Sequence, residues 1–506
     1  MIKKLLSLLA VLLLLPFSSS QALNGPVYEV FVASYADSNK DGMGDLIGLA
    51  EKIPYIRELC VSALWLMPIH PSPSYHKYDV LDYYAVDKSY GSMEDFLFLS
   101  QQLKKADIKL ILDLVINHSS NMHPWFLSAS KSLNTKPCGK EICPHKELCI
   151  SHNPYVNYYN FTKGEGQHKV PDAYGWYYLG NFGAHMPDFN LDDANLRNEL
   201  LNIARFWVEN GADGFRLDAV IHFYEQNAEK NKDFLHWFIH SLKEIKPDIY
   251  IVGEAWSDDN TVLRLYESGI DSLFDFSLAG SGGHIVKAMR NGDGASLASY
   301  LDKRYKAIKA ANPASQNAPF LSNHDMGRIA GTLMRKEQQI KQAAAIYLTL
   351  PGVPYIYYGE EIALTGSGRD ENKRLPMLWN SRGENITLPP KDADQKQRQT
   401  KGVEEQEGEP SSVLNFYKQL LNVRSSTPVF TYGELNSIDL GLKGIAAWEI
   451  SFEKNTLSVY HNLSKQEAVL NVNAGTLLYA GDTGSGAPVL SDGVLIMPSG
   501  SSCIIK

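Results

Sequence analysis

The sequence is poor in cysteine, has no surplus of positive charge and, after its first residues, has no long hydrophobic run. It holds 5 cysteines in 506 residues, and 48 lysines and arginines against 57 acidic residues give a formal net charge of −9. Nucleic-acid-binding proteins normally carry a basic surplus, so we expect no nucleic-acid partner. A membrane-spanning helix needs about 20 apolar residues, so we expect no membrane span in the mature chain.

The first residues have the order of a secretory signal peptide. Lys3 and Lys4 precede an apolar run over residues 5–17, and three small serines follow at 18–20. This order predicts a signal peptide over residues 1–20 and a secreted or periplasmic protein. The alternative is an uncleaved anchor, which the short run disfavours.

Three of the cysteines, Cys138, Cys143 and Cys149, lie close together in the chain. For an exported protein the favoured interpretation is a loop closed by one disulfide, with an odd thiol left over. The alternative is a zinc site that combines the three thiolates with His145 or His152.

The rest of the chain alternates short apolar runs with helical patterns, which is typical of βα units around a parallel sheet. The fold class is therefore expected to be α/β, a (β/α)₈ TIM barrel. About eight runs are candidates for its strands, at residues 27–34, 63–69, 108–116, 214–220, 249–255, 273–278, 319–322 and 353–358.

The spacing of the runs is interrupted once, after the third, by a long stretch rich in Asn, Tyr, His, Pro and Cys. A structureless loop of that length is improbable, so we expect an inserted small domain there, and the short alternating strands near the end predict a C-terminal antiparallel β domain. The expected domains are a barrel over 21–118 and 192–427, an insertion over 119–191 and a β domain over 428–506.

Lone carboxylates stand at the ends of three of the predicted strands. GFRLDAV carries Asp218, IVGEAW carries Glu254 and FLSNHD carries Asp325. Because catalytic groups of such barrels lie where the strands end, we expect the three to share one rim. A pair of carboxyls, one nucleophilic and one kept protonated, is what glycoside hydrolysis requires.

Four segments in this order, DLVINH, GFRLDAVIH, GEAW and SNHD, resemble the motifs of the α-amylase family of glycoside hydrolases. The resemblance extends over essentially the whole mature length. It implies a retaining double-displacement hydrolase of α-glucans, with Asp218 as nucleophile, Glu254 as general acid and base, and Asp325 as the group that stabilises the distorted sugar.

The resemblance also implies a set of substrate-binding residues. Arg216 would keep Asp218 ionised, His118 and His324 would bind sugar hydroxyls, and Tyr78, followed by Asp79, would stack under the sugar at the point of cleavage.

A calcium site is expected in the first loop, DSNKDGMGD. Its Asp37, Asn39, Asp41 and Asp45 have the oxygen-rich spacing that suits Ca²⁺, and related branches of the family add a backbone carbonyl, here that of Met43. The alternative for this loop is a metal-free Asx-turn. Many α-amylases hold a second calcium, which here would use Asn117, Asp188 and the carbonyl of His222, but branches that resemble this sequence often lack it.

The branch of the family is indicated by conflicting residues. The segment MPDFN resembles that of the branches intermediate between oligo-1,6-glucosidases and neopullulanases. In contrast, Ala219 follows the nucleophile, as in family members that cleave α-1,4 bonds. Ile221 stands where many α-amylases have Lys. We expect a secreted, monomeric α-amylase. The alternatives are an exo-acting α-glucosidase or oligo-1,6-glucosidase and, more remotely, a non-catalytic relative that serves as a binding partner.

Overall fold

The structure of the protein is a computed structural model that describes residues 23–395, 401–473 and 475–506. The predicted signal peptide lies outside the described residues. Among the helices that are described, none combines the length and the apolar composition needed to cross a bilayer.

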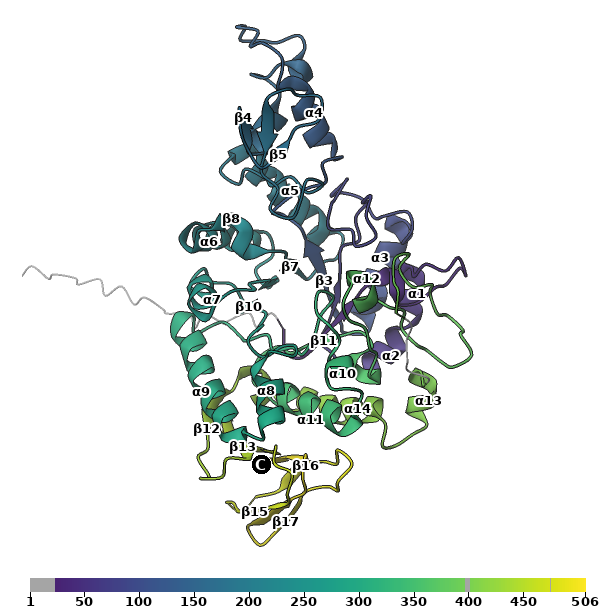
Figure 1. Ribbon diagram of the computed structural model, residues 1–506, viewed down its shortest axis with the longest axis vertical. Coiled ribbons are helices and arrows are strands. Elements are labelled where there is room, and N and C mark those ends of the chain that lie inside the picture. Colours follow the sequence, from purple (N-terminus) through teal and green to yellow (C-terminus); the bar gives the residue numbers. More distant parts are fainter. Residues whose placement is uncertain (1–22, 396–400, 474) are drawn as a thin grey trace, which may run out of the picture.

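A curled parallel sheet forms the centre of the molecule, in agreement with the predicted barrel (Figure 1). Each strand runs parallel to its neighbours, in the order β10-β9-β7-β3-β2-β1-β11. In chain order these strands are β1 (Val27–Val30), β2 (Ala63–Leu66), β3 (Lys109–Leu114), β7 (Gly214–Leu217), β9 (Tyr250–Gly253), β10 (Ser272–Leu273) and β11 (Tyr355–Tyr357).

The seventh predicted strand, at residues 319–322, closes the ring without becoming a regular strand. Single parallel bridges join Phe274 to Ala318 on one side and Phe320 to Tyr355 on the other. The chain therefore fills the gap between β10 and β11, and the first strand pairs with the last through Val27 and Tyr355.

Alternation along the strands separates the two faces of the barrel. Val27, Trp65 and Ile111 belong to an inner apolar cluster, whereas Leu64 and Leu112 belong to the large cluster under the helices. The same period puts Glu29, Asp113 and Arg216 on the inner face, so three charged side chains are buried inside the barrel.

Amphipathic helices cover the outer face. In α5 (Ala194–Glu209) the buried residues Leu196, Leu200, Ile203, Ala204 and Trp207 recur at helical spacing. The other helices of more than one turn around the barrel are α1 (Leu46–Glu51), α2 (Ile53–Glu58), α3 (Met93–Lys105), α6 (Ala228–Ile245), α7 (Asp259–Tyr266), α8 (His284–Asn291), α9 (Gly294–Ala311), α11 (Glu337–Leu348) and α14 (Val413–Ser425).

Short elements connect this framework. They are η1 (Val32–Ser34), η4 (Val220–His222), β8 (Phe223–Gln226), α10 (Ile329–Thr332), η5 (Glu360–Ile362), α12 (Asp370–Lys373), α13 (Val403–Glu407) and α15 (Val429–Tyr432).

Between β3 and α5 the chain leaves the barrel and forms a small insertion, drawn at the top of Figure 1. Its antiparallel sheet has the order β4-β6-β5. All five cysteines of the protein are free in this structure, so the disulfide favoured from the sequence is not formed. The elements of the insertion are α4 (Pro124–Ser132), η2 (Lys146–Leu148), η3 (Pro154–Tyr158), β4 (Phe161–Lys163), β5 (His168–Lys169) and β6 (Trp176–Tyr178).

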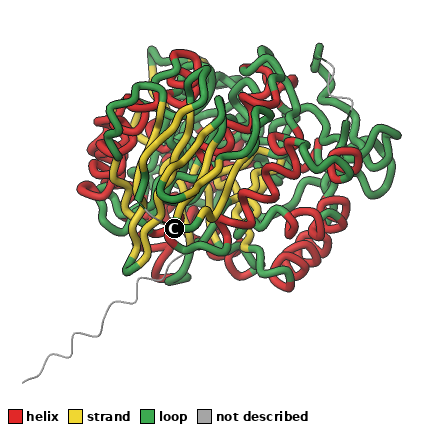
Figure 2. The backbone as a smooth tube through the Cα atoms, turned by 90° about the horizontal axis from the view of Figure 1, so that it is seen from below, coloured by secondary structure: helices red, strands yellow, loops and turns green. Residues whose placement is uncertain are grey.

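The C-terminal part is antiparallel, as predicted, and lies at the opposite end of the molecule from the insertion (Figure 1). Figure 2 shows its strands side by side on the face toward the viewer. One sheet contains β12 (Glu434–Ser437), β13 (Ile445–Phe452), β14 (Asn455–Asn462), β19 (Ser502–Ile505) and β16 (Leu477–Gly481), and the other β15 (Ala468–Asn471), β18 (Val494–Met497) and β17 (Val489–Ser491).

A close backbone approach joins the C-terminal sheets to the barrel. A Cβ atom at Gly294, the first residue of α9, would lie 2.3 Å from the backbone nitrogen of Ala446 in β13. Glycine is required at this position because any side chain would push the sheet away from the helix. The exact boundaries of the three domains remain predictions.

Candidate active site

A cavity of about 400 Å³ opens where the barrel strands end. The three carboxylates predicted from the strand ends, Asp218, Glu254 and Asp325, all line it. The other lining residues are His76, Tyr78, His118, Phe182, Met186, Ala219, Ile221, His222, Trp256, Asp370 and Arg374.

The Arg216 guanidinium donates hydrogen bonds to two of these carboxylates, Asp218 and Glu254. Its Nη1 lies 2.6 Å from Asp218 Oδ1 and 2.9 Å from Asp113 Oδ1, while its Nη2 donates to Glu254 Oε2. Arg216 is fully buried. One planar fork therefore holds the two groups that the retaining mechanism needs in fixed positions relative to each other.

Burial makes Glu254 suited to hold a proton. Desolvation, opposed by the charge of Arg216 and assisted by that of Asp218, raises the pKa of Glu254 to about 7. Asp113, on the other side of Arg216, also has its pKa raised to about 7, again chiefly by burial. A carboxyl with a pKa near 7 serves as a general acid at neutral pH.

The surroundings of Asp325 have the opposite effect. Burial alone would raise its pKa, but the charges of His324, Arg374 and Arg216 hold it below the usual range of a carboxyl. His324 Nε2 lies 3.0 Å from Asp325 Oδ2, and Arg374 Nη2 lies 2.9 Å from Asp325 Oδ1. Asp325 is therefore an anion clamped between two cations.

His324 is charged because it lies between two carboxylates. Burial alone would lower the pKa of His324, but the negative charges of Asp325 and Glu29 raise it to about 10. Its Nδ1 lies 2.5 Å from Glu29 Oε1. The His324 ring also stacks on Tyr78, with ring centroids 5.6 Å apart.

The other predicted sugar-binding residues differ in their surroundings. His118 lines the cavity and its Nε2 is buried without a hydrogen-bond partner among the described residues, and its part in sugar binding stays a prediction. Tyr78 lines the cavity, and its hydroxyl donates to Asp113 at 3.1 Å. Asp79 Oδ1 accepts from Ser72 and is absent from the cavity wall, so its part in sugar binding stays a prediction.

Sequence reasoning missed Arg374, Glu29 and Trp256. Arg374 and Glu29 reach the site from residues far away in the chain. Glu29 lies in the predicted first strand, and Arg374 opens RLPMLW, a segment that resembles the same branches of the family as MPDFN but indicates no role for the arginine. Trp256 is the last residue of GEAW, but the motif does not indicate its position. In the structure its ring is 54% exposed, stacks on Phe276 and lines the cavity.

The first loop offers the oxygen donors predicted for calcium. Asp37 Oδ2 accepts from Gly42 N at 2.7 Å, and Asp41 Oδ1 accepts from Met43 N at 2.8 Å. Asn39 Oδ1 accepts from Asp41 N, and Asp45 caps α1 through Gly48 N. Carboxylate, amide and carbonyl oxygens are the donors that calcium prefers, so the loop fits calcium chemically. Among the described residues, however, the carboxylates of this loop do not come close enough together to share one ion.

The predicted second calcium site is partly paired within the protein. Asn117 Nδ2 donates to the His222 carbonyl at 2.7 Å. Asp188 Oδ1 is buried and has no partner among the described residues, and burial raises the pKa of Asp188 to about 7. An oxygen left in this way is the kind of group that a cation would satisfy.

The comparisons with known proteins agree with this geometry. A family model described as "Alpha amylase, catalytic domain" matches residues 29–433. "Alpha-amylase 3" of Dictyoglomus thermophilum is 37% identical, covering 89% of this chain and 87% of that protein.

Solved structures show the same similarity. Eubacterium rectale Amy13B has a TM-score of 0.90 and 36% identity, covering 96% of each chain. An α-amylase from H. orenii has a TM-score of 0.82 and 34% identity, covering 95% of this chain and 99% of the other.

Proposed function

The chain belongs to the α-amylase family of glycoside hydrolases, and we propose that within this family it is an α-amylase that cleaves α-1,4 bonds in starch, glycogen or maltodextrins. The observation that carries the proposal is the Arg216 fork, which joins Asp218 to a Glu254 whose pKa is raised to about 7. The similarity to two proteins named α-amylases, at 34% and 37% identity, supports the α-1,4 assignment.

Members of this family retain the anomeric configuration by two displacements. In the first, Asp218 Oδ attacks the anomeric carbon while Glu254 gives its proton to the leaving glycosidic oxygen, so a glycosyl ester forms and the sugar chain departs with a new hydroxyl. Arg216 Nη1 donates to Asp218 Oδ1 and so holds the nucleophile in position for attack.

The second displacement reverses the roles. Glu254, now a carboxylate, removes a proton from water, and the hydroxide attacks the anomeric carbon and releases Asp218. The anionic Asp325 stabilises the oxocarbenium-like transition state through the sugar hydroxyls, and His324 and Arg374 hold it in place.

The test is the product distribution over time from amylose, maltotriose, isomaltose and pullulan, with wild type and Glu254→Gln. Endo-cleavage of α-1,4 bonds predicts a spread of maltooligosaccharides from amylose with early loss of iodine staining, abolished in the variant. Full activity of the variant would overturn the catalytic assignment.

An exo-acting α-glucosidase is the second candidate, favoured by Ile221 in the cavity wall where many α-amylases have Lys. A relative named oligo-1,6-glucosidase from Bacillus cereus is 27% identical. Release of glucose alone, from maltotriose or isomaltose, would establish this alternative and exclude the first.

Calcium binding and export belong to the same proposal. The oxygen-rich spacing of Asp37, Asn39 and Asp41 supports a Ca²⁺ ion in the first loop, and the unpaired Asp188 Oδ1 supports a second. Element analysis of the wild type and of Asp37→Ala tests the first site by the loss of one calcium per chain.

Export is supported by the N-terminal pattern, and an intact mass that lacks residues 1–20 would verify it.

A further inference from the structure

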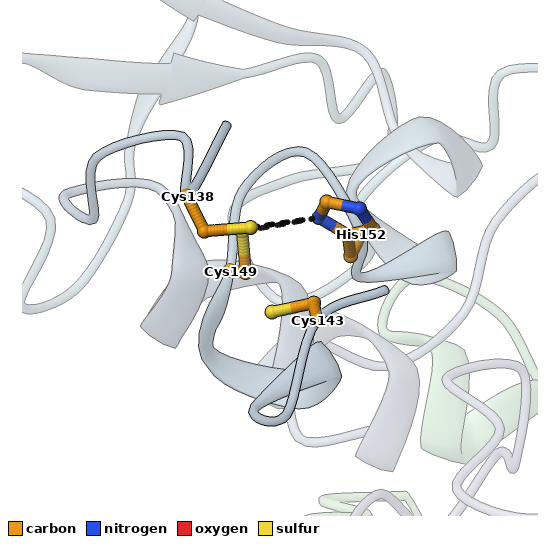
Figure 3. Close-up of side chains that lie close together, drawn as sticks. All are labelled: Cys138, Cys143, Cys149 and His152. Atoms are coloured by element: carbon orange, nitrogen blue, oxygen red, sulfur yellow. Dashed lines mark hydrogen bonds between the residues drawn. The ribbon is translucent and has the colours of Figure 1, made fainter. Parts of the chain in front are cut away.

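Three cysteines and a histidine of the insertion converge in space (Figure 3). The side chains are those of Cys138, Cys143, Cys149 and His152, and one ligand atom from each lies within 4.8 Å of the others. Cys143 and Cys149 are 6% and 5% exposed. His145, the other histidine considered from the sequence, is not part of the group.

The distances within the group match those between ligands of one metal ion. His152 Nδ1 lies 3.6 Å from Cys138 Sγ and 3.4 Å from Cys149 Sγ. Around a tetrahedral zinc ion with Zn–S of about 2.3 Å and Zn–N of about 2.0 Å, a sulfur and a nitrogen lie about 3.5 Å apart. A neutral imidazole nitrogen that accepts has one lone pair, so a thiol hydrogen bond accounts for only one of the two contacts.

The segment around the group lacks an apolar core of its own. Of its larger apolar side chains, Ile142 is 81% exposed, Leu148 is 54% exposed and Ile150 is only partly buried against the main core. The sulfur atoms are what the segment buries. Small units that cannot bury enough apolar surface are held by disulfides or by a metal ion, and one disulfide here would leave the third sulfur unused beside His152.

The backbone already places two of the ligands together. His152 N and Asn153 N both donate to the Cys149 carbonyl at 2.9 Å, and Asn153 Nδ2 donates to the Glu147 carbonyl at 3.1 Å. The turn between Cys149 and His152 therefore holds these two ligands close together.

We propose that Cys138, Cys143, Cys149 and His152 bind one Zn²⁺ ion that fixes the fold of the insertion. Four protein ligands fill a tetrahedral shell, so the ion has no open position for water or substrate and is structural. Each thiol gives up its proton as its sulfur donates a lone pair to the metal, no electron is transferred, and the site with three thiolates carries a net charge of −1.

The first experiment is element analysis and thiol counting on the untagged full-length protein after incubation with zinc and desalting. We expect about one zinc per chain in the wild type and its loss in Cys143→Ser and His152→Asn. Cys60→Ser, which removes a cysteine outside the group, is the matched control and keeps the metal. A wild type without zinc, or one in which peptide mapping finds a disulfide among the three cysteines, overturns the proposal.

If the variants do not fold, a spectroscopic measurement on the wild type alone still tests the proposal. Cobalt(II) in place of zinc is expected to give thiolate-to-metal charge-transfer absorption and the intense visible bands of a tetrahedral ion. Weak bands of an octahedral ion, without charge transfer, would exclude thiolate ligands. Neither readout depends on glycosidase activity, so this proposal and the proposed function fail separately.

Discussion

At the scale of single residues, two carboxyls of one cavity differ in protonation because their neighbours differ. Burial raises the pKa of Glu254 to about 7, whereas His324 and Arg374 hold Asp325 ionised against the effect of burial. A pair whose pKa values are moved apart is what separates an acid from an electrostatic stabiliser.

Glu254 predicts the alkaline limb of the pH profile. The general acid works only while protonated, so kcat is expected to fall as pH rises through about 7. Glu254→Gln should lower kcat by about 10²–10⁴-fold and remove this limb. The measurement is kcat on maltooligosaccharides between pH 5 and 9. An alkaline limb near the ordinary glutamate pKa of about 4.3, seen as a kcat that has already fallen at pH 5, would contradict the assignment.

Arg374 predicts a loss that sequence motifs do not foresee. Arg374→Met removes the charged hydrogen bond to Asp325 and that to the Tyr75 hydroxyl, each worth about 1.5–3 kcal/mol where a charge is involved. We expect kcat/KM to fall about 10–100-fold, mainly through kcat. Arg382→Met, at an exposed arginine paired with Glu404, is the control, and a change confined to KM would show that Arg374 only binds substrate.

The difference between the residues that were predicted and those that were missed has a physical origin. Asp218, Glu254 and Asp325 each follow a predicted strand, and parallel strands end at one rim, so their proximity could be inferred from the chain. Glu29 meets His324 across 295 residues, and Arg374 lies in a loop without periodicity. Contacts of this kind depend on the closed barrel and leave no local pattern.

At the scale of elements, the ends of helices were easier to predict than short strands. Apolar residues at helical spacing predict helices over 196–209 and 413–424. The structure has α5 and α14 there, within two residues at each end. The strands of the insertion have two or three residues each, too few for alternation to show. The predicted seventh barrel strand pairs with its neighbours at isolated positions only, so it does not form a regular strand.

The cap of α5 predicts a local loss of stability. Asp193 Oδ1 accepts from Leu196 N at 2.8 Å at the start of the helix. Asp193→Ala is expected to lower the free energy of unfolding by about 0.5–2 kcal/mol, measured by urea denaturation. Asp233→Ala, on the exposed face of α6, should change it by less than about 0.5 kcal/mol. Equal effects of the two would mean that the cap contributes nothing specific.

At the scale of the whole molecule, buried carboxyls make stability depend on pH. Burial raises the pKa of Asp113, Asp188, Glu254 and Glu360 to about 7 in each case. Between the unfolded value near 4 and this folded value, the folded chain binds more protons than the unfolded one. These four groups therefore stabilise the protein fully below about pH 4 and lose that contribution as pH rises through 7.

Glu360 allows a test away from the cavity. It accepts hydrogen bonds from the hydroxyls of Tyr347 and Tyr417 and from Ser322. Glu360→Gln is neutral at every pH, so its melting temperature relative to wild type should rise from pH 5 to pH 8 by on the order of 3 °C. A difference that stays constant over this range would show that Glu360 has an ordinary pKa.

The pairing of the first barrel strand with the last has a consequence for biosynthesis. Val27 of β1 pairs with Tyr355 of β11, 328 residues later. A ribosome adds about 5–20 residues per second, so roughly 20–60 s pass before β1 can meet its second neighbour. During that time an apolar strand edge lies open to other chains, and the nascent protein is expected to depend on chaperones until the ring closes.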